Sequence, residues 1–144
     1  MLRQRIYQLP DDVIREYILP YTYEPQSQEL CKDIRNYYEV SNHLLTKYQQ
    51  IYKDGYNNED KEWLLNDIGR FMNEDKATMF GYVDFYIQFF QRIYMLQNAT
   101  RDQVIEFLQS PKYYPFTRDI YRNIGFMKPH EREKLKSFIA TINS

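Results

Sequence analysis

The side chains that could carry out chemistry are few in this sequence and lie far apart. The chain of 144 residues contains two histidines, His43 and His130, and one cysteine, Cys31. A metal site needs several His, Cys or carboxylate ligands that converge, and a nucleophilic cysteine needs a base beside it. We expect both histidines to be solvated and Cys31 to be a small, partly buried residue. The sequence therefore predicts no metal, no cofactor and no catalytic residue.

Two polar clusters are the remaining places where a carboxylate could act. The first contains Asp11, Asp12 and Glu16, and the second is a stripe of Asp84, Gln88, Gln91 and Arg92. Acids in a first helical turn stabilise the helix dipole, and the one-turn spacing of the stripe predicts hydrogen bonds along a helix. The phosphate-binding, dinucleotide-binding, serine-hydrolase and zinc-protease motifs are all absent. We predict that the protein is not an enzyme, and a site assembled only by the fold is the alternative.

Charge and aromatic content bear on the type of partner. The net charge is −1, with 19 basic and 20 acidic residues, which disfavours binding to nucleic acid even though Tyr113 and Tyr114 follow Lys112. The chain has 15 Tyr and 9 Phe, and aromatic residues are enriched at protein interfaces. An AT-rich genome or a core filled by aromatics would explain the same composition. We predict that Tyr113 and Tyr114 contact a protein partner.

The segment from Met79 to Leu96 is the most apolar part of the chain. At 100° per residue its polar positions fall on one narrow stripe, and the other faces carry large apolar side chains. We therefore expect a helix at about residues 76–97, buried on most of its circumference at the centre of a bundle. Asp84 and Arg92 argue against a membrane span.

The elements that surround this segment are also predicted to be helices. We expect a short helix at 10–19, a long one from a Ser27 cap to Gly55, and a third with Trp63 facing inward. Further helices are expected after the Thr100 capping box, after a Thr117 cap as far as Gly125, and from Pro129. No strand pattern is visible. The prediction is an all-α fold in which residues 1–144 form one compact, irregular or orthogonal bundle of six or seven helices.

Residues 9–19, LPDDVIREYIL, resemble the start of the F-box, a helical motif that docks on Skp1-type adaptors of ubiquitin ligases. The resemblance extends loosely over residues 9–45. It implies that the apolar positions of the motif face the adaptor. These candidate partner-binding residues are Leu9, Pro10, Val13, Ile14 and Ile18.

The segment PYTYEPQ follows this motif in a chain rich in tyrosine and asparagine, and the whole is similar to small proteins of large nucleocytoplasmic DNA viruses. The resemblance implies a structural or assembly role with viral proteins as partners. The start of the chain has no signal-peptide pattern, so we expect an intracellular or virion location. The predicted function is a non-catalytic protein–protein interaction protein, with an F-box-like adaptor as the alternative and a small enzyme as the second alternative.

Overall fold

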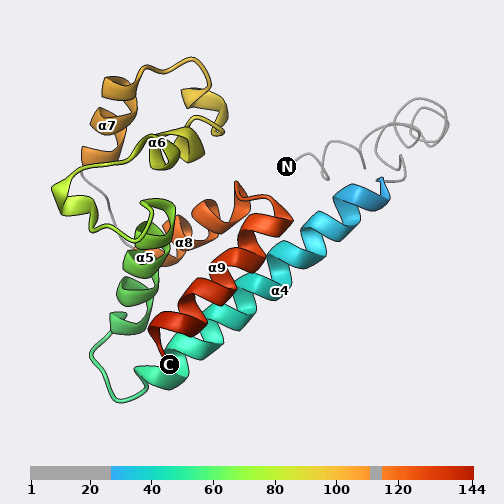
Figure 1. Cartoon of the computed structure of the whole chain (residues 1–144). Coiled ribbons are helices and arrows are strands. Elements are labelled where there is room, and N and C mark those ends of the chain that lie inside the picture. The colour runs from blue at the N-terminus through green and yellow to red at the C-terminus, as the bar shows by residue number, and fades with distance from the viewer. Residues whose placement is uncertain (1–26, 111–114) are drawn as a thin grey trace, which may run out of the picture. The chain divides into compact units, whose positions relative to one another are not determined.

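A computed structural model of the protein describes residues 27–110 and 115–144 (Figure 1). Their regular structure is entirely helical, which confirms the predicted all-α class. The helix expected at residues 10–19 lies outside the described residues. The α-helices are α4 (Gln28–Ile51), α5 (Glu59–Met72), α6 (Asp84–Phe90), α7 (Arg101–Gln109), α8 (Phe116–Gly125) and α9 (Pro129–Ile142). Two 3-10 helices, η2 (Thr78–Phe80) and η3 (Tyr94–Leu96), flank α6.

The chain divides into two units, residues 1–32 and 33–144. In the described part of the first unit, the Ser27 hydroxyl accepts a hydrogen bond from the Leu30 N–H at 3.1 Å, so Ser27 caps α4 as predicted. The packing described below is that of the second unit.

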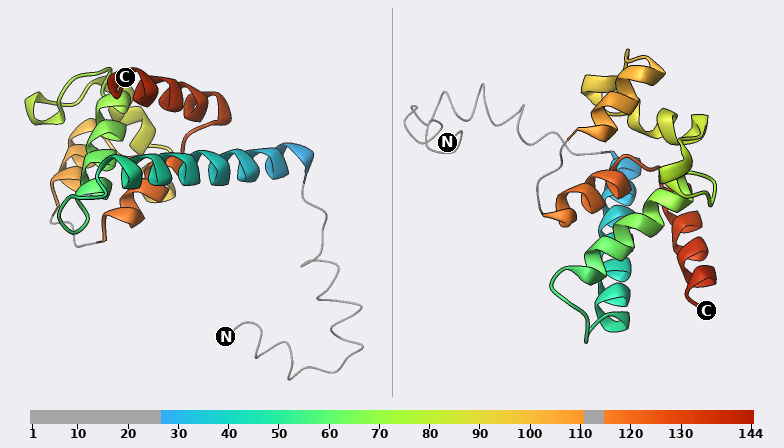
Figure 2. Two further views of the ribbon diagram at one scale, coloured as in Figure 1. Left: turned by 90° about the horizontal axis from the view of Figure 1, so that it is seen from below. Right: turned by 90° about the vertical axis from the view of Figure 1, so that its left-hand side faces the viewer.

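Helix α5 lies at the centre of the second unit, in contact with α6, α8 and α9. Its buried apolar face of Leu64, Ile68 and Met72 joins one continuous core. Helix α9 runs alongside α4 (Figures 1 and 2). The other large side chains that are fully buried come from α4, α6, α8 and α9: Val40, Leu44, Tyr48, Phe89, Phe90, Ile120, Ile124, Leu135 and Ile139.

The predicted central helix at 76–97 is wrong in its extent and in its burial. Only α6 is α-helical there, and η2 and η3 are separated from it by extended residues. Gly81 has a φ of 119°, a conformation that L side chains rarely adopt, so the helix cannot run through it. Phe89 and Phe90 are buried as expected, but the two ends of the segment reach solvent.

Two predicted helix starts match the structure. Thr100 accepts a hydrogen bond from the Gln103 N–H at 3.3 Å, and the Gln103 side chain accepts one from the Thr100 N–H at 2.9 Å. This reciprocal pair is the predicted capping box. Pro129 occupies the first turn of α9, also as predicted.

The predicted end of α8 at Gly125 is confirmed, but other predicted details of the helix ends are wrong. The long helix is also expected to end in a left-handed Gly55, but α4 ends at Ile51, and among the described residues positive φ angles occur at Asn58, Glu74, Asp75 and Gly81. Tyr56 is expected to fold back on Ile51, but its side chain is exposed, and its N–H donates to the Glu59 carboxylate at 3.1 Å. Helix α8 begins at Phe116 with Pro115 as its cap, so Thr117 is not the cap.

Two aromatic side chains have different partners from those expected. Phe126, after the end of α8, is expected to contact Tyr121. Its ring packs instead against Phe89 and Phe90, with centroid distances of 5.7 and 5.4 Å. Trp63 does not face inward. It stacks on Tyr52 at the end of α4 and remains 46% exposed.

Candidate protein-interaction surface

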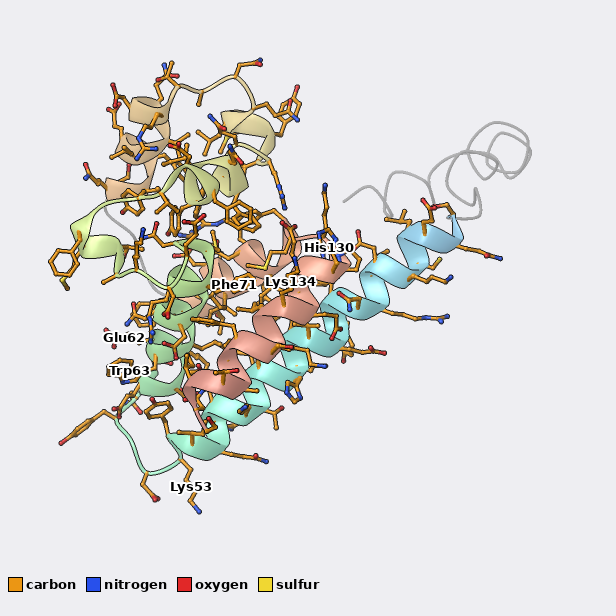
Figure 3. The ribbon with its side chains drawn as sticks, viewed as in Figure 1. Lys53, Glu62, Trp63, Phe71, His130 and Lys134 are labelled. Atoms are coloured by element: carbon orange, nitrogen blue, oxygen red, sulfur yellow. The ribbon has the colours of Figure 1, made fainter. Side chains whose placement is uncertain are left out.

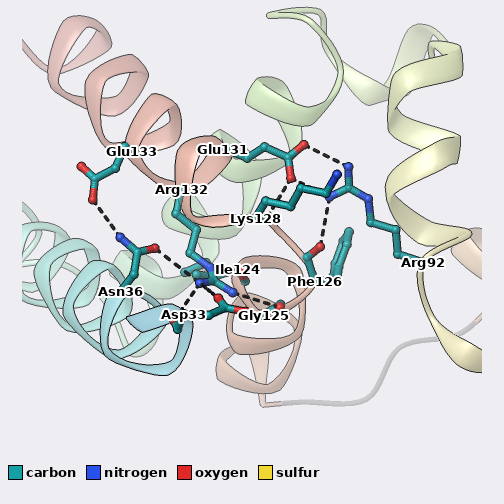
Figure 4. Close-up of polar contacts among 10 residues, drawn as sticks. All are labelled: Asp33, Asn36, Arg92, Ile124, Gly125, Phe126, Lys128, Glu131, Arg132 and Glu133. Carbon is teal, nitrogen blue, oxygen red and sulfur yellow. Dashed lines mark hydrogen bonds and ion pairs between the residues drawn. The ribbon is translucent and has the colours of Figure 1, made fainter. Parts of the chain in front are cut away.

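The most extensive polar cluster surrounds Arg132 in α9 (Figure 4). Its guanidinium donates five hydrogen bonds: to the carbonyl oxygens of Asp33, Ile124 and Gly125, and to the side-chain oxygens of Asp33 and Asn36. The fork of donors therefore ties α4, α8 and α9 together. The hydrogen-bond donors of the Arg132 guanidinium are engaged by acceptors of the protein itself, so we assign Arg132 a structural role.

A second cluster joins the end of α6 to the start of α9 (Figure 4). Arg92 donates to both carboxylate oxygens of Glu131, at 2.6 and 3.0 Å, and to the Phe126 carbonyl at 3.1 Å. The Lys128 N–H also donates to Glu131, at 2.7 Å. Burial opposes ionisation of Glu131, but the hydrogen bonds from Arg92 and Lys128 outweigh it and hold the pKa below its usual value.

The hydrogen bonds predicted along the stripe of Asp84, Gln88, Gln91 and Arg92 are not formed among the described residues. Gln88 is exposed, and the other three side chains bond other parts of the chain. Asp84 pairs with Arg101 at 2.5 Å, and Gln91 donates to the Ala99 carbonyl at 3.1 Å. Arg92 pairs with Glu131 as described. The stripe lies at the surface as expected, but it anchors the start of α6 to α7 and the residues after α6 to α9.

A third cluster lies between α4 and α5. The Tyr48 hydroxyl donates to Asp67 at 2.5 Å and accepts from the Asn143 amide at 3.2 Å. Burial, followed by the hydrogen bond to Asp67, raises the pKa of Tyr48. A neutral tyrosine that donates to a buried carboxylate satisfies both groups, so this cluster also supports the fold.

Arg122 in α8 is a half-buried cation. It pairs with Asp119 at 3.3 Å and lies over the rings of Phe90 and Phe107, at 5.4 and 5.9 Å from their centroids. Burial lowers its pKa, and Asp119 opposes that shift. The cation–π contacts explain why a charged group is placed among aromatic rings.

The described residues contain no group of three or more His, Cys, Asp or Glu side chains that could hold a metal ion. His43 and His130 are exposed, as predicted, and Cys31 is half-buried. Within residues 27–110 and 115–144, no helix has both the length and the apolar character needed to cross a membrane.

What the fold does present is a set of large apolar side chains on η2 and η3. Met79, Phe80, Tyr94 and Met95 are 82, 86, 86 and 77% exposed. We call these four residues the tip residues. The two turns lie on either side of α6, so the tip residues form two exposed apolar pairs (Figure 1). Single exposed apolar residues are common, but pairs of this size on short turns are candidate binding surfaces.

The turn that carries Met79 and Phe80 is held by Asn73, which is fully buried. Its amide nitrogen donates to the carbonyls of Lys76 and Gly81, each at 3.0 Å, and its oxygen accepts from the Val83 N–H at 2.8 Å. One side chain thus fixes both ends of the loop around η2. Met79 and Phe80 are presented by an ordered turn.

The turn that carries Tyr94 and Met95 is also fixed. Leu96 is buried, its N–H donates to the Ile93 carbonyl at 2.8 Å, and Gln91 bonds the Ala99 carbonyl beyond the turn. A hollow of about 420 Å³ lies beside it. The hollow is lined by Tyr94, Met95, Leu96, Asn98, Ala99 and Gln103.

The partner-binding residues predicted from the sequence, namely Leu9, Pro10, Val13, Ile14, Ile18, Tyr113 and Tyr114, lie outside the described residues. Sequence reasoning missed the tip residues because they belong to an apolar run that was expected to be buried. Gly81 inside that run was a signal that the helix would break between Phe80 and α6.

The chain matches no family model, and no curated protein or solved structure shows significant similarity to it.

Proposed function

We propose that this chain is a non-catalytic protein-binding component whose tip residues insert into a protein partner. The observation that carries the proposal is the exposure of Met79, Phe80, Tyr94 and Met95 on turns that buried side chains hold in place. Aromatic residues and methionine are enriched in the cores of protein interfaces.

The energetic argument rests on apolar area and on order. Burying a large apolar side chain contributes about 1.5–3 kcal/mol, so four tip residues offer a substantial part of a binding free energy. Because the turns are already fixed, little conformational entropy is lost when a partner covers them. Ordered display of methionine and aromatic side chains is therefore well suited to recognition.

The biological setting is proposed from the sequence alone. The similarity to small proteins of large nucleocytoplasmic DNA viruses supports a structural or assembly role, in which the partner is another viral protein. The alternative, an F-box-like adaptor, depends on Leu9, Pro10 and the motif that follows them. Each setting implies a different set of co-purifying proteins.

The test is affinity purification of the full chain from its native host cells, followed by mass spectrometry. A variant with Met79, Phe80, Tyr94 and Met95 all replaced by Ser should lose its principal partner and keep its melting temperature. Tyr38→Ser is the matched control, because Tyr38 is an exposed aromatic on α4, away from both turns. Retention of every partner by the quadruple variant would refute the proposal.

A second variant distinguishes the adaptor. Replacing Leu9 and Pro10 by Ala should leave recovery of viral structural proteins intact if the tip residues form the interface. Recovery of a Skp1-type protein by the wild-type chain, and its loss from the folded double variant, would establish the adaptor function instead.

A further inference from the structure

A second hollow, separate from the tip residues, lies where the loop after α4 meets the first two turns of α5. It has a volume of about 400 Å³ and is lined by Tyr56, Asn57, Glu59, Glu62, Trp63 and Asn66. Figure 3 shows Glu62 and Trp63 on the side of α5 that points away from α9. Two aromatic rings and two carboxylates thus border one open space.

The Trp63 ring that lines the hollow is supported by two other aromatic rings. Trp63 stacks on Tyr52 with an interplanar angle of 6° and a centroid distance of 6.3 Å, and Tyr52 in turn contacts the buried Tyr48 at 6.1 Å. These contacts fix the indole while leaving it 46% exposed. Tyr56, at 92% exposure, contributes a second ring.

The charge of this region is negative. Residues 53–67 contain five acidic and two basic side chains. Asp60 pairs with Lys61 and Asp67 pairs with Arg70, so those carboxylates are engaged. Glu59 accepts the Tyr56 N–H, which uses one of its oxygens, and Glu62 is exposed. Glu59 and Glu62 are therefore the carboxylates available to a ligand.

We propose that this hollow binds an arginine side chain of a protein partner. A guanidinium is planar, so it stacks on the exposed part of the indole, and its parallel N–H donors match a carboxylate. Lysine has the charge but neither the flat face nor the fork of donors. The site goes beyond the function proposed above, because it lies on different elements and recognises a cation instead of an apolar surface.

The experiment uses the fact that Trp63 is the single tryptophan of the chain, so its fluorescence and indole N–H signal report on this site alone. The full chain is titrated with acetyl-Gly-Arg-Gly-amide, the lysine peptide and the uncharged citrulline peptide. We expect a saturable change with the arginine peptide, a weaker response to lysine, and none to citrulline. Binding should also weaken when the salt concentration is raised to 0.5 M, because the Debye length then falls to roughly 4 Å and the attraction between the guanidinium and the carboxylates is screened.

Two variants test the assignment of residues. Glu62→Gln should weaken arginine-peptide binding about tenfold, as expected for loss of one charge-assisted hydrogen bond. Tyr56→Ala should also weaken it without changing the melting temperature. Glu106→Gln, an exposed acid on α7, is the matched control and should have no effect.

Equal responses to the arginine and citrulline peptides would overturn the inference, as would equal effects of Glu62→Gln and Glu106→Gln. Such a result would leave the proposed function untouched, because that proposal is measured by partner loss in the tip-residue variant. Conversely, if the tip-residue variant keeps its principal partner and Glu62→Gln loses it, the principal interface is this hollow and not the tip residues.

Discussion

The start of α9 is more buried than its charged residues suggest, and the segment from Met79 to Leu96 is less buried than its apolar residues suggest. The first is highly charged, yet Glu131 and Arg132 are only 6 and 2% exposed. The second is the most apolar segment of the chain, yet its two ends reach solvent at the tip residues. Burial in this protein is thus not a simple function of residue type.

The difference shows what burial requires of each kind of side chain. A charged group is buried when every donor or acceptor has a partner, and Arg132 has five acceptors supplied by α4 and α8. An apolar group is buried only where a neighbour covers it. On the turn that ends at Gly81 and is held by Asn73, Met79 and Phe80 remain exposed.

The largest effect should come from the part of the apolar segment that is buried. Phe90→Ala removes a fully buried ring that packs on Tyr86, Phe107 and Phe126, and it should lower the free energy of unfolding by about 3–5 kcal/mol. Chemical denaturation measures this. A loss below about 1 kcal/mol would mean that α6 is not part of the core.

The buried cation of α9 should have the next largest effect. Arg132→Ala removes the donor to the Gly125 carbonyl, one of the donors to the Ile124 carbonyl and the cation paired with Asp33, and we expect a loss of about 3 kcal/mol in the free energy of unfolding. Arg132→Lys keeps the charge but not the planar set of guanidinium donors, so it should be less destabilising than Arg132→Ala but still less stable than the wild-type protein. Full stability in the lysine variant would show that charge alone matters at this position.

The ion pair between Arg92 and Glu131 should make stability depend on pH. The pKa of Glu131 is lower in the folded chain than its ordinary value of 4.5, so ionised Glu131 stabilises the fold above pH 4.5. That contribution is lost as the pH falls from 4.5 through the folded-state pKa. Glu131→Gln should destabilise the protein by about 1–3 kcal/mol at neutral pH and should flatten the acid side of the profile. Parallel acid profiles for the two proteins would contradict this role.

The smallest effect is expected at the exposed ends of the apolar segment. Tyr94→Ser and Met95→Ser should each change the free energy of unfolding by less than about 0.5 kcal/mol, because neither side chain packs in the core. Thermal and chemical unfolding of the isolated chain provide the measurement. Destabilisation comparable to that of Phe90→Ala would show that these residues are part of the core and not of a binding surface.

The sequence by itself determined the features that depend on a few neighbouring residues. The Ser27 cap, the Thr100 capping box and the start of α9 at Pro129 follow from local hydrogen bonds and backbone angles, and all three are present. The all-α class follows from apolar periodicity, which is also local.

The tertiary structure decided which helix is central, which charges are buried and which aromatic residues face solvent. Periodicity places apolar residues on one face of a helix, but it does not say how long the helix runs or which neighbour covers each face. Asn73 forms two of its bonds, and Gln91 its bond to Ala99, with residues eight to ten positions along the chain. Arg132 forms three of its bonds with Asp33 and Asn36, almost one hundred positions away. Such contacts exist only once the chain is folded, and they place the tip residues and Trp63 where a partner can reach them.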